Sequence, residues 1–286
     1  MKPGTRRAIT QVSIAAGLLA GVSCGRSHPV ATLAVHPVTV NLGPSQVTPL
    51  TLRWNPTSPL EGLRGKPRVF VHVLDGGRRL LRTFDHPLPE SWTPGRAQRY
   101  EIELYQSAIG DPLPPGAYEM TFGLYDDGGK KRWPLAVDGE EVGRDEYRLA
   151  SLVATSATAA APSFEFRGPW APVEPGSSKQ VIARRCLSAG GTIAVGGAHS
   201  PGTVRVAASI NTNAAAPGSG GAWRVSATCS PDTLEVSTSE LRWVGFPVTA
   251  AAGDPPCEIR FEPPASAGGS PAQALCLEVL AWRPRP

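Results

Sequence analysis

Apolar and polar residues alternate with a period of two along most of the chain. The clearest examples are the segments 50–54, 100–104, 118–124, 204–210, 223–229 and 257–261. A period of two is typical of a β-strand that lays one face on a core. The 3.6-residue period of an amphipathic helix does not occur convincingly anywhere. The pattern therefore predicts an all-β chain.

A glycine pair marks one connection between these strands. Gly76-Gly77 lies between residues 68–75 and 78–85, and it predicts a β-hairpin with a two-residue type I′ turn. In that register Asp85 pairs opposite Arg68, and it lies well along the strand from His72. A second tight turn is expected at 126–129.

The alternation divides the chain into two parts. Seven or eight strands are expected between 35 and 150, with the turn spacing of a Greek-key sandwich. Residues 151–163 turn small and polar and are predicted to be a linker, and 164–286 then resume the alternation. The 31 glycines and 30 prolines suit short strands joined by turns. We expect two β-sandwiches in series.

The first 23 residues have the composition of a secretory signal. Lys2, Arg6 and Arg7 form a basic start, and residues 8–23 carry no charge. That uncharged stretch is shorter than the roughly 20 apolar residues that a membrane span needs. Residues 1–23 are therefore predicted to be a signal peptide.

The segment after the signal points to a lipid anchor. Gly21-Val22-Ser23-Cys24-Gly25 resembles the lipobox of bacterial lipoproteins, although the family prefers Leu at the place of Gly21. The resemblance implies that Cys24 carries the lipid, with 24–34 as the lipidated end and tether. It implies attachment to the cell envelope, by default at the outer membrane and facing the periplasm or the outside. The alternative is a secreted protein without an anchor.

The remaining cysteines are even in number. With Cys24 lipidated, four of the five are left, namely Cys186, Cys229, Cys257 and Cys276. In an oxidising compartment they are expected to form two disulfides, and three pairings stay open. Cys229 and Cys257 both fall on the apolar face of their predicted strands.

One stretch of the first half resembles an immunoglobulin-like module of bacterial envelope proteins. It covers residues 66–135 and includes Phe70-Val-His-Val-Leu-Asp75, Asp85-His86-x-Leu-Pro89, Trp92-Thr-Pro-Gly95, Leu113-Pro-Pro-Gly-Ala-Tyr118 and Gly123-Leu-Tyr-Asp126. Similar modules are appended to some membrane glycosyltransferases. The resemblance implies a sandwich fold and carries no catalytic residue. In such sandwiches a Tyr after a tight turn bonds to backbone upstream, and Tyr118 is the candidate for this tyrosine corner.

Charge and residue chemistry exclude several functions. The net charge of +4 falls to +1 without the three basic residues of the signal, which argues against nucleic acid as a partner. His72 and His86 are expected to be structural, since no further ligands converge near them as a metal site requires. Glu101 and Glu103 alternate along one strand face and are expected to be solvated. The sequence predicts no cofactor, no metal and no enzyme.

Two tryptophans are the candidates for ligand contact. Trp92 and Trp170 stand beside prolines in loop-like segments, where an exposed indole ring can stack on a sugar. The sequence thus predicts a non-catalytic, lipid-anchored envelope protein that recognises a protein or a polysaccharide, or holds an assembly together. The alternatives are a carbohydrate-binding lipoprotein and an envelope hydrolase with a pocket at the junction of the two halves.

Overall fold

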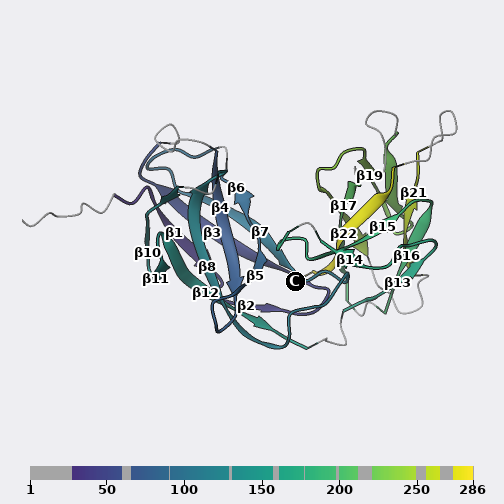
Figure 1. Cartoon of the computed structure of the whole chain (residues 1–286), viewed down its shortest axis with the longest axis horizontal. Helices are drawn as coiled ribbons and strands as arrows, with labels where there is room; N and C mark the ends of the chain where they lie inside the picture. Colours follow the sequence, from purple (N-terminus) through teal and green to yellow (C-terminus); the bar gives the residue numbers. More distant parts are fainter. Residues whose placement is uncertain are drawn as a thin grey trace, which may run out of the picture.

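The strands of the protein form two lobes that lie side by side (Figure 1). The computed structural model describes residues 28–59, 66–89, 91–128, 131–156, 161–176, 178–197, 200–211, 221–248, 256–264 and 273–285. All regular structure in these residues is β-strand. This confirms the prediction of an all-β chain with two sandwiches in series. None of the described residues forms a helix with the length and apolarity of a membrane span.

The first sandwich packs two sheets against each other. Its strands are β1 (Ala31–His36), β2 (Thr39–Leu42), β3 (Val47–Pro56), β4 (Pro67–Leu74), β5 (Leu80–Thr83), β6 (His86–Pro87), β7 (Gln98–Tyr105), β8 (Gly116–Asp126), β9 (Arg132–Trp133), β10 (Leu135–Val137), β11 (Glu140–Gly143) and β12 (Glu146–Ala154). One sheet has the order β10-β1-β3-β7 and the other β11-β12-β8-β4-β5, with β2, β6 and β9 paired to β12, β4 and β8. The strands exceed the predicted number because several are only two to four residues long.

The predicted alternation places the core of this sandwich correctly. Leu50, Leu52 and Trp54 of β3 are fully buried, and Met120 and Phe122 of β8 face them from the other sheet. Burying a side chain of this size contributes about 1.5–3 kcal/mol each. The apolar side chains of the alternating pattern thus hold the two sheets together, at the positions that the sequence predicted.

The hairpin between β4 and β5 differs from the prediction. The left-handed residue of the turn is Arg78 (φ 61°), and neither glycine has a positive φ. The carboxylate of Asp75 accepts hydrogen bonds from the backbone N–H groups of Gly77 and Arg79, which favours this longer turn. Three residues therefore separate the paired ends, as in a type I turn followed by a bulge.

This longer turn moves the partner strand along the ladder. Arg68 pairs with Pro87 and not with Asp85. Asp85 instead accepts a hydrogen bond from the backbone of Val71 at 3.3 Å, and its Oδ1 lies 3.7 Å from Nε2 of His72. The expected distance between Asp85 and His72 was wrong, because it assumed the two-residue turn.

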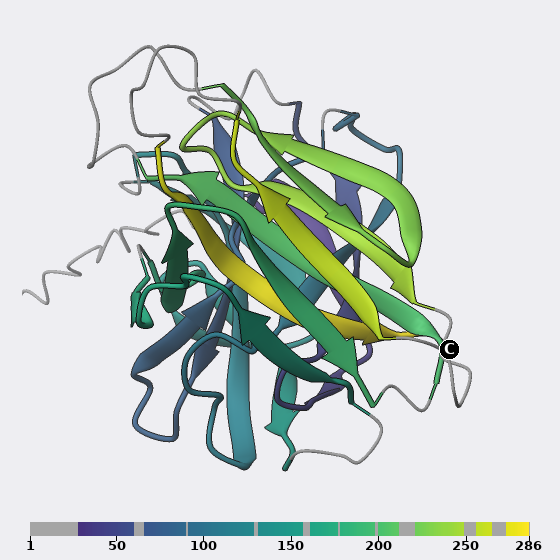
Figure 2. The ribbon, with the colours of Figure 1, turned by 90° about the vertical axis from the view of Figure 1, so that its right-hand side faces the viewer.

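The second sandwich also has two sheets, and Figure 2 looks onto it with β22 in yellow across its middle. Its strands are β13 (Ser163–Arg167), β14 (Glu174–Pro175), β15 (Ala183–Leu187), β16 (Gly191–Gly196), β17 (Gly202–Ile210), β18 (Trp223–Ala227), β19 (Ser230–Val236), β20 (Arg242–Val248), β21 (Cys257–Glu262) and β22 (Leu275–Pro284). The sheet orders are β13-β16-β21-β18-β19 and β14-β15-β22-β17-β20.

Two disulfides pair the four cysteines of the second sandwich. Cys186 of β15 is bonded to Cys276, which lies directly opposite on β22, and Cys229 is bonded to Cys257. The first bond joins neighbouring strands of one sheet, and the second joins the turn after β18 to the neighbouring strand β21. Cys229 is exposed in the turn after β18 and does not face inward as predicted, because that strand ends at Ala227.

The strand ends differ from the predicted boundaries. β1 begins at Ala31, so the last residues of the expected tether are strand. β12 continues to Ala154, which places the start of the predicted linker inside the sheet. The predicted signal peptide and Cys24 lie outside the described residues.

The predicted tyrosine corner is confirmed. The hydroxyl of Tyr118 donates a hydrogen bond of 2.7 Å to the carbonyl oxygen of Pro114, four residues upstream. This bond holds the turn before β8 against the strand, so the loop around Leu113 and Pro114 has a fixed conformation.

Candidate functional site at the junction of the two sandwiches

The outer face of one sheet in the second sandwich packs on the first sandwich. Ala207 of β17 and Val279 and Ala281 of β22 are fully buried within the hydrophobic core cluster of the first sandwich. Their small side chains let the backbones approach. The N–H of Ala108 donates to the carbonyl oxygen of Leu280 at 2.7 Å. The two lobes therefore share a packed, hydrogen-bonded interface.

A glycine marks the closest approach of the two lobes. Gly110 has a left-handed backbone (φ +83°), and a Cβ atom there would lie 2.5 Å from the Cβ of Ala183. Both the backbone conformation and the space require glycine. The loop after β7 and the start of β15 thus touch without room for another methyl group.

Ion pairs close the side of the junction next to β7. The carboxylate of Glu103 accepts hydrogen bonds of 2.8 Å from both Arg205 and Arg283 of the second sandwich. Arg283 also donates to Glu101 at 2.7 Å. Burial alone would lower the pKa of Arg283, but the bonds to the two glutamates outweigh it and raise that pKa. The prediction that these two glutamates are simply solvated was wrong.

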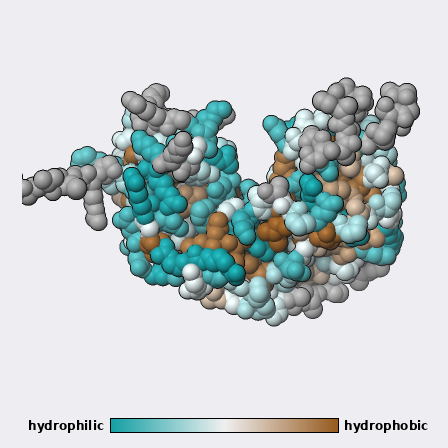
Figure 3. All heavy atoms as spheres, viewed as in Figure 1, coloured by the Kyte–Doolittle hydropathy of each residue, from teal (hydrophilic) through white to brown (hydrophobic). Residues whose placement is uncertain are grey.

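These ion pairs line a cleft of about 540 Å³ between the lobes. The notch that separates the upper halves of the lobes is visible in Figure 3, and β6 and β7 lie on the side of the first lobe that faces it (Figure 1). Trp243 of β20 is half-buried in the cleft. The centre of its ring lies 5.4 Å from that of Tyr105, with the two planes at 62°, and the guanidinium of Arg205 lies 5.8 Å from its centre.

His86 also lines this cleft, but its ring is fully engaged. Nδ1 lies 3.0 Å from the carbonyl oxygen of Phe84, and Nε2 lies 2.8 Å from the hydroxyl of Tyr100. Burial lowers the pKa of His86. A neutral imidazole with both nitrogens hydrogen-bonded stabilises the fold, as the sequence predicted.

His72 of β4 belongs to a polar cluster in the same sheet as His86. Burial lowers its pKa, while the nearby Asp85 opposes that shift. Asp85 in turn accepts a hydrogen bond of 3.0 Å from the hydroxyl of Tyr125. Among the described residues, no three His, Cys, Asp or Glu side chains converge as a metal site needs.

The two tryptophans proposed for ligand contact are buried. Trp92 is 5% exposed and donates its indole N–H to the carbonyl oxygen of Ser58, while its ring packs on Trp54. Trp170 is 9% exposed and donates to the carbonyl oxygen of Thr192. Each ring fills space at a sandwich core instead of facing solvent. The prediction of exposed rings for sugar stacking was therefore wrong for both.

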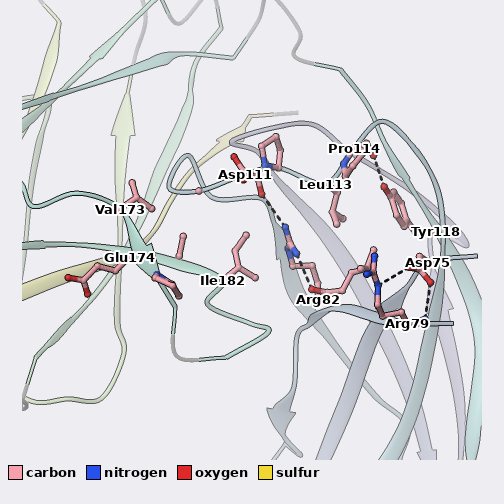
Figure 4. A pocket seen from close by; sticks show the side chains of 15 residues that line it. Asp75, Arg79, Arg82, Asp111, Leu113, Pro114, Tyr118, Val173, Glu174 and Ile182 are labelled. Carbon is pink, nitrogen blue, oxygen red and sulfur yellow. Dashed lines mark hydrogen bonds and ion pairs between the residues drawn. The ribbon is translucent and has the colours of Figure 1, made fainter. Parts of the chain in front are cut away.

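A second pocket, of about 540 Å³, opens elsewhere along the junction (Figure 4). Its walls come from the loop before β8, from β5, and from residues 173–175 and 182–183 of the second sandwich. Arg82 lies in the middle of this pocket in Figure 4. The sequence offered no signal for it, because its two walls are at least 55 residues apart along the chain, from Tyr118 to Val173.

Comparison with known proteins assigns no family. No family profile matches the sequence, and no curated protein is similar to it. Among solved structures, the β-glucuronidase of Bacteroides uniformis is 9% identical with a TM-score of 0.28, covering 90% of this chain and 30% of that one. The M60 catalytic domain of Clostridium perfringens ZmpB with its CBM51-1 and CBM51-2 domains is 10% identical with a TM-score of 0.29, covering 88% and 31%. The chain spans under a third of either structure, and only its own residues bear on its function.

Proposed function

We propose that this chain is a lipid-anchored protein of the bacterial cell envelope that acts without catalysis, as a rigid two-sandwich module that recognises a partner. The observation that carries the proposal is the ion-paired junction. Glu103 holds Arg205 and Arg283 at 2.8 Å each, so the two lobes present their surfaces in one fixed arrangement. A fixed arrangement suits recognition by surfaces and loops.

The same contacts favour recognition over hydrolysis. A general base needs a carboxylate or imidazole that is free to take a proton within reach of a substrate. In the junction cleft, Glu101 and Glu103 bind arginines, and both nitrogens of His86 have partners. The ionisable groups of the cleft thus hold the protein together.

The proposals of a lipid anchor and of an outer-membrane localisation are based on the N-terminal sequence. Cys24 follows an uncharged stretch of signal-like composition, and Gly25 after it is not the Asp that would retain a lipoprotein at the inner membrane. We place the protein at the outer membrane, with an envelope protein or a polysaccharide as its partner.

Lipid attachment is tested in the full chain with a clickable palmitate analogue and membrane fractionation. We expect the wild type to be labelled and to sediment with the outer membrane, and Cys24→Ala to lose both properties. Cys276→Ser is the matched control, because it removes a different cysteine and should keep the label. An unlabelled wild type would contradict the anchor.

Rigidity is tested with one spin label on each lobe of the full chain. The distance distribution should be narrow in the wild type and clearly broader in Glu103→Ala. Equal widths would show that the ion pairs do not fix the lobes, and the basis for a rigid recognition module would be lost.

Binding to a polysaccharide is the second candidate, and Trp243 favours it. Its half-buried ring stands in the cleft beside Arg205 and Glu103, so an aromatic face and polar groups occur together. Saturable binding of cell-wall or capsular glycans that Trp243→Ala abolishes would support it. Binding that Trp243→Ala leaves unchanged would exclude this cleft as the site.

A further inference from the structure

Arg82 is a cation without a charged partner at the junction. Its guanidinium donates to two backbone carbonyl oxygens, that of Leu81 at 3.0 Å and that of Asp111 at 3.2 Å. No carboxylate lies within ion-pair distance of it among the described residues. An arginine carries five N–H donors, so these two bonds leave donors for a further acceptor.

Two of the three carboxylates around the pocket have ion-pair partners, and the third, Asp111, is exposed to solvent. Asp75 binds Arg79 at 3.1 Å, and Glu174 binds Arg184 at 3.2 Å. Burial removes Arg82 partly from water, which disfavours its positive charge and lowers its pKa. An anion placed beside it would relieve that penalty.

The walls of the pocket are mainly apolar. Leu113 and Tyr118 lie on one side of Arg82 in Figure 4, and Ile182 and Val173 lie on the other. Val173 is 51% exposed, one of two large apolar side chains with high exposure in the described part of the chain. Val173 therefore adds exposed apolar area to the lining of the pocket, which the apolar part of a ligand could cover.

The pocket is held in shape before any ligand arrives. The tyrosine corner fixes the loop of Leu113 and Pro114, and the contact of Gly110 with Ala183 fixes the opposite wall. The volume of about 540 Å³ suits a small molecule. Preformed walls reduce the entropy that is lost on binding.

We propose that this pocket, with Arg82 at its centre, binds a small organic anion: a carboxylate, sulfonate or phosphate carried on an apolar ring or chain. The anionic group would accept hydrogen bonds from the guanidinium of Arg82, and the apolar part would cover Val173, Ile182 and Leu113. This site adds to the proposed function and does not rest on it.

The test titrates two fluorescent probes that differ in one group. The anionic probe is 1-anilinonaphthalene-8-sulfonate, and the neutral one is N-phenyl-1-naphthylamine, which has the same rings without the sulfonate. The protein is the full chain with Cys24→Ala, so that no detergent is needed. We expect one saturable site for the anionic probe and binding at least tenfold weaker for the neutral one.

Three variants decide whether the site is this pocket. Arg82→Met should weaken binding of the anionic probe at least tenfold. Val173→Asp should also weaken its binding, because it places a negative charge at the mouth of the pocket. Arg53→Met is the matched control, since Arg53 is exposed on the outer face of β3. It should bind like the parent chain.

The proposal is overturned if the anionic probe does not saturate at one site, or if Arg82→Met binds it as tightly as the parent. Arg82 also binds the backbone of Asp111, so a melting curve of Arg82→Met checks whether the loss of that bond destabilises the fold. If it does, Val173→Asp decides alone, since that position is exposed. Unchanged affinity in Val173→Asp refutes the pocket.

Discussion

Removing the Glu103 carboxylate tests how the two sandwiches are held together. Its side chain is 19% exposed, and those of Arg205 and Arg283 are 27% and 36% exposed. A buried hydrogen bond to a charged group contributes about 1.5–3 kcal/mol, whereas a solvent-exposed ion pair contributes about 0–1 kcal/mol. The solvent exposure of these three side chains lies between the two cases, so we expect each bond to Glu103 to contribute about 1 kcal/mol. Glu103→Ala should therefore lower the free energy of unfolding by about 2 kcal/mol.

The measurement is the free energy of unfolding in urea, with thermal melting beside it. For a chain of this size, a loss of about 2 kcal/mol lowers the Tm by roughly 4–8 °C. Glu119→Ala is the matched control, because Glu119 pairs with Arg148 inside the first sandwich and the two side chains, 33% and 43% exposed, lie nearer to solvent than Glu103 and Arg205. It should cost less than about 1 kcal/mol.

A double-mutant cycle separates the ion pair from other effects of the substitution. Combining Glu103→Ala with Arg205→Met should give a coupling energy of about 1 kcal/mol that shrinks in 1 M salt. A coupling energy within about 0.3 kcal/mol of zero would refute the reasoning. The pair of Glu103 with Arg205 would then contribute nothing to the junction, which also has the apolar contacts of Ala207, Val279 and Ala281.

Three further predictions follow from individual residues. Gly110→Ala should destabilise the protein by about 2 kcal/mol or more in urea unfolding, because the left-handed backbone costs about 1–2 kcal/mol and the added methyl clashes across the junction; a neutral effect would contradict the close contact. Burial lowers the pKa of both His72 and His86 below 6.5, so the unfolded chain binds more protons than the folded one as the pH falls. The free energy of unfolding should therefore decrease between about pH 7 and 5. The double variant His72→Gln/His86→Gln should lose this pH dependence of the Tm, and an unchanged dependence would contradict the reasoning. Cys276→Ser opens a loop of 90 residues and Cys257→Ser one of 28, so the first should cost about 1 kcal/mol more in the unfolding free energy; the reverse order would contradict the loop-entropy argument.

Much of the fold could be predicted from the sequence because strand patterning is local. The alternation in β3 and β18 identifies Leu52, Trp54, Trp223 and Val225 as core residues, and all four are fully buried. The motif around Tyr118 likewise lies within a few residues, and its hydrogen bond is present. Each of these features depends on the nearest neighbours along the chain.

The candidate site could not be predicted in this way, because its partners are far apart in sequence. Glu103 and Arg205 are separated by 102 residues, and Glu103 and Arg283 by 180. A glutamate on an alternating strand has the same pattern whether it faces water or an arginine of another lobe. The prediction for Trp92 and Trp170 was wrong for a related reason, since the sequence does not show whether an indole ring in a loop faces solvent or packs in a core.

One sequence signal does point to the junction. The run 275–282 contains a single charged residue, Glu278, and such a continuous apolar stretch is typical of a strand buried on both faces. β22 is buried in that way, since residues 275–277 and 279–282 are all buried and their side chains alternate between the two faces of the sheet. Its outward residues Val279 and Ala281 are covered by the first sandwich. One face of β22 thus packs in the core of the second sandwich, and its other face packs on the first. Substitutions in this strand should therefore disturb both lobes together. The orientation of the two lobes depends on the same strand as the fold of the second sandwich.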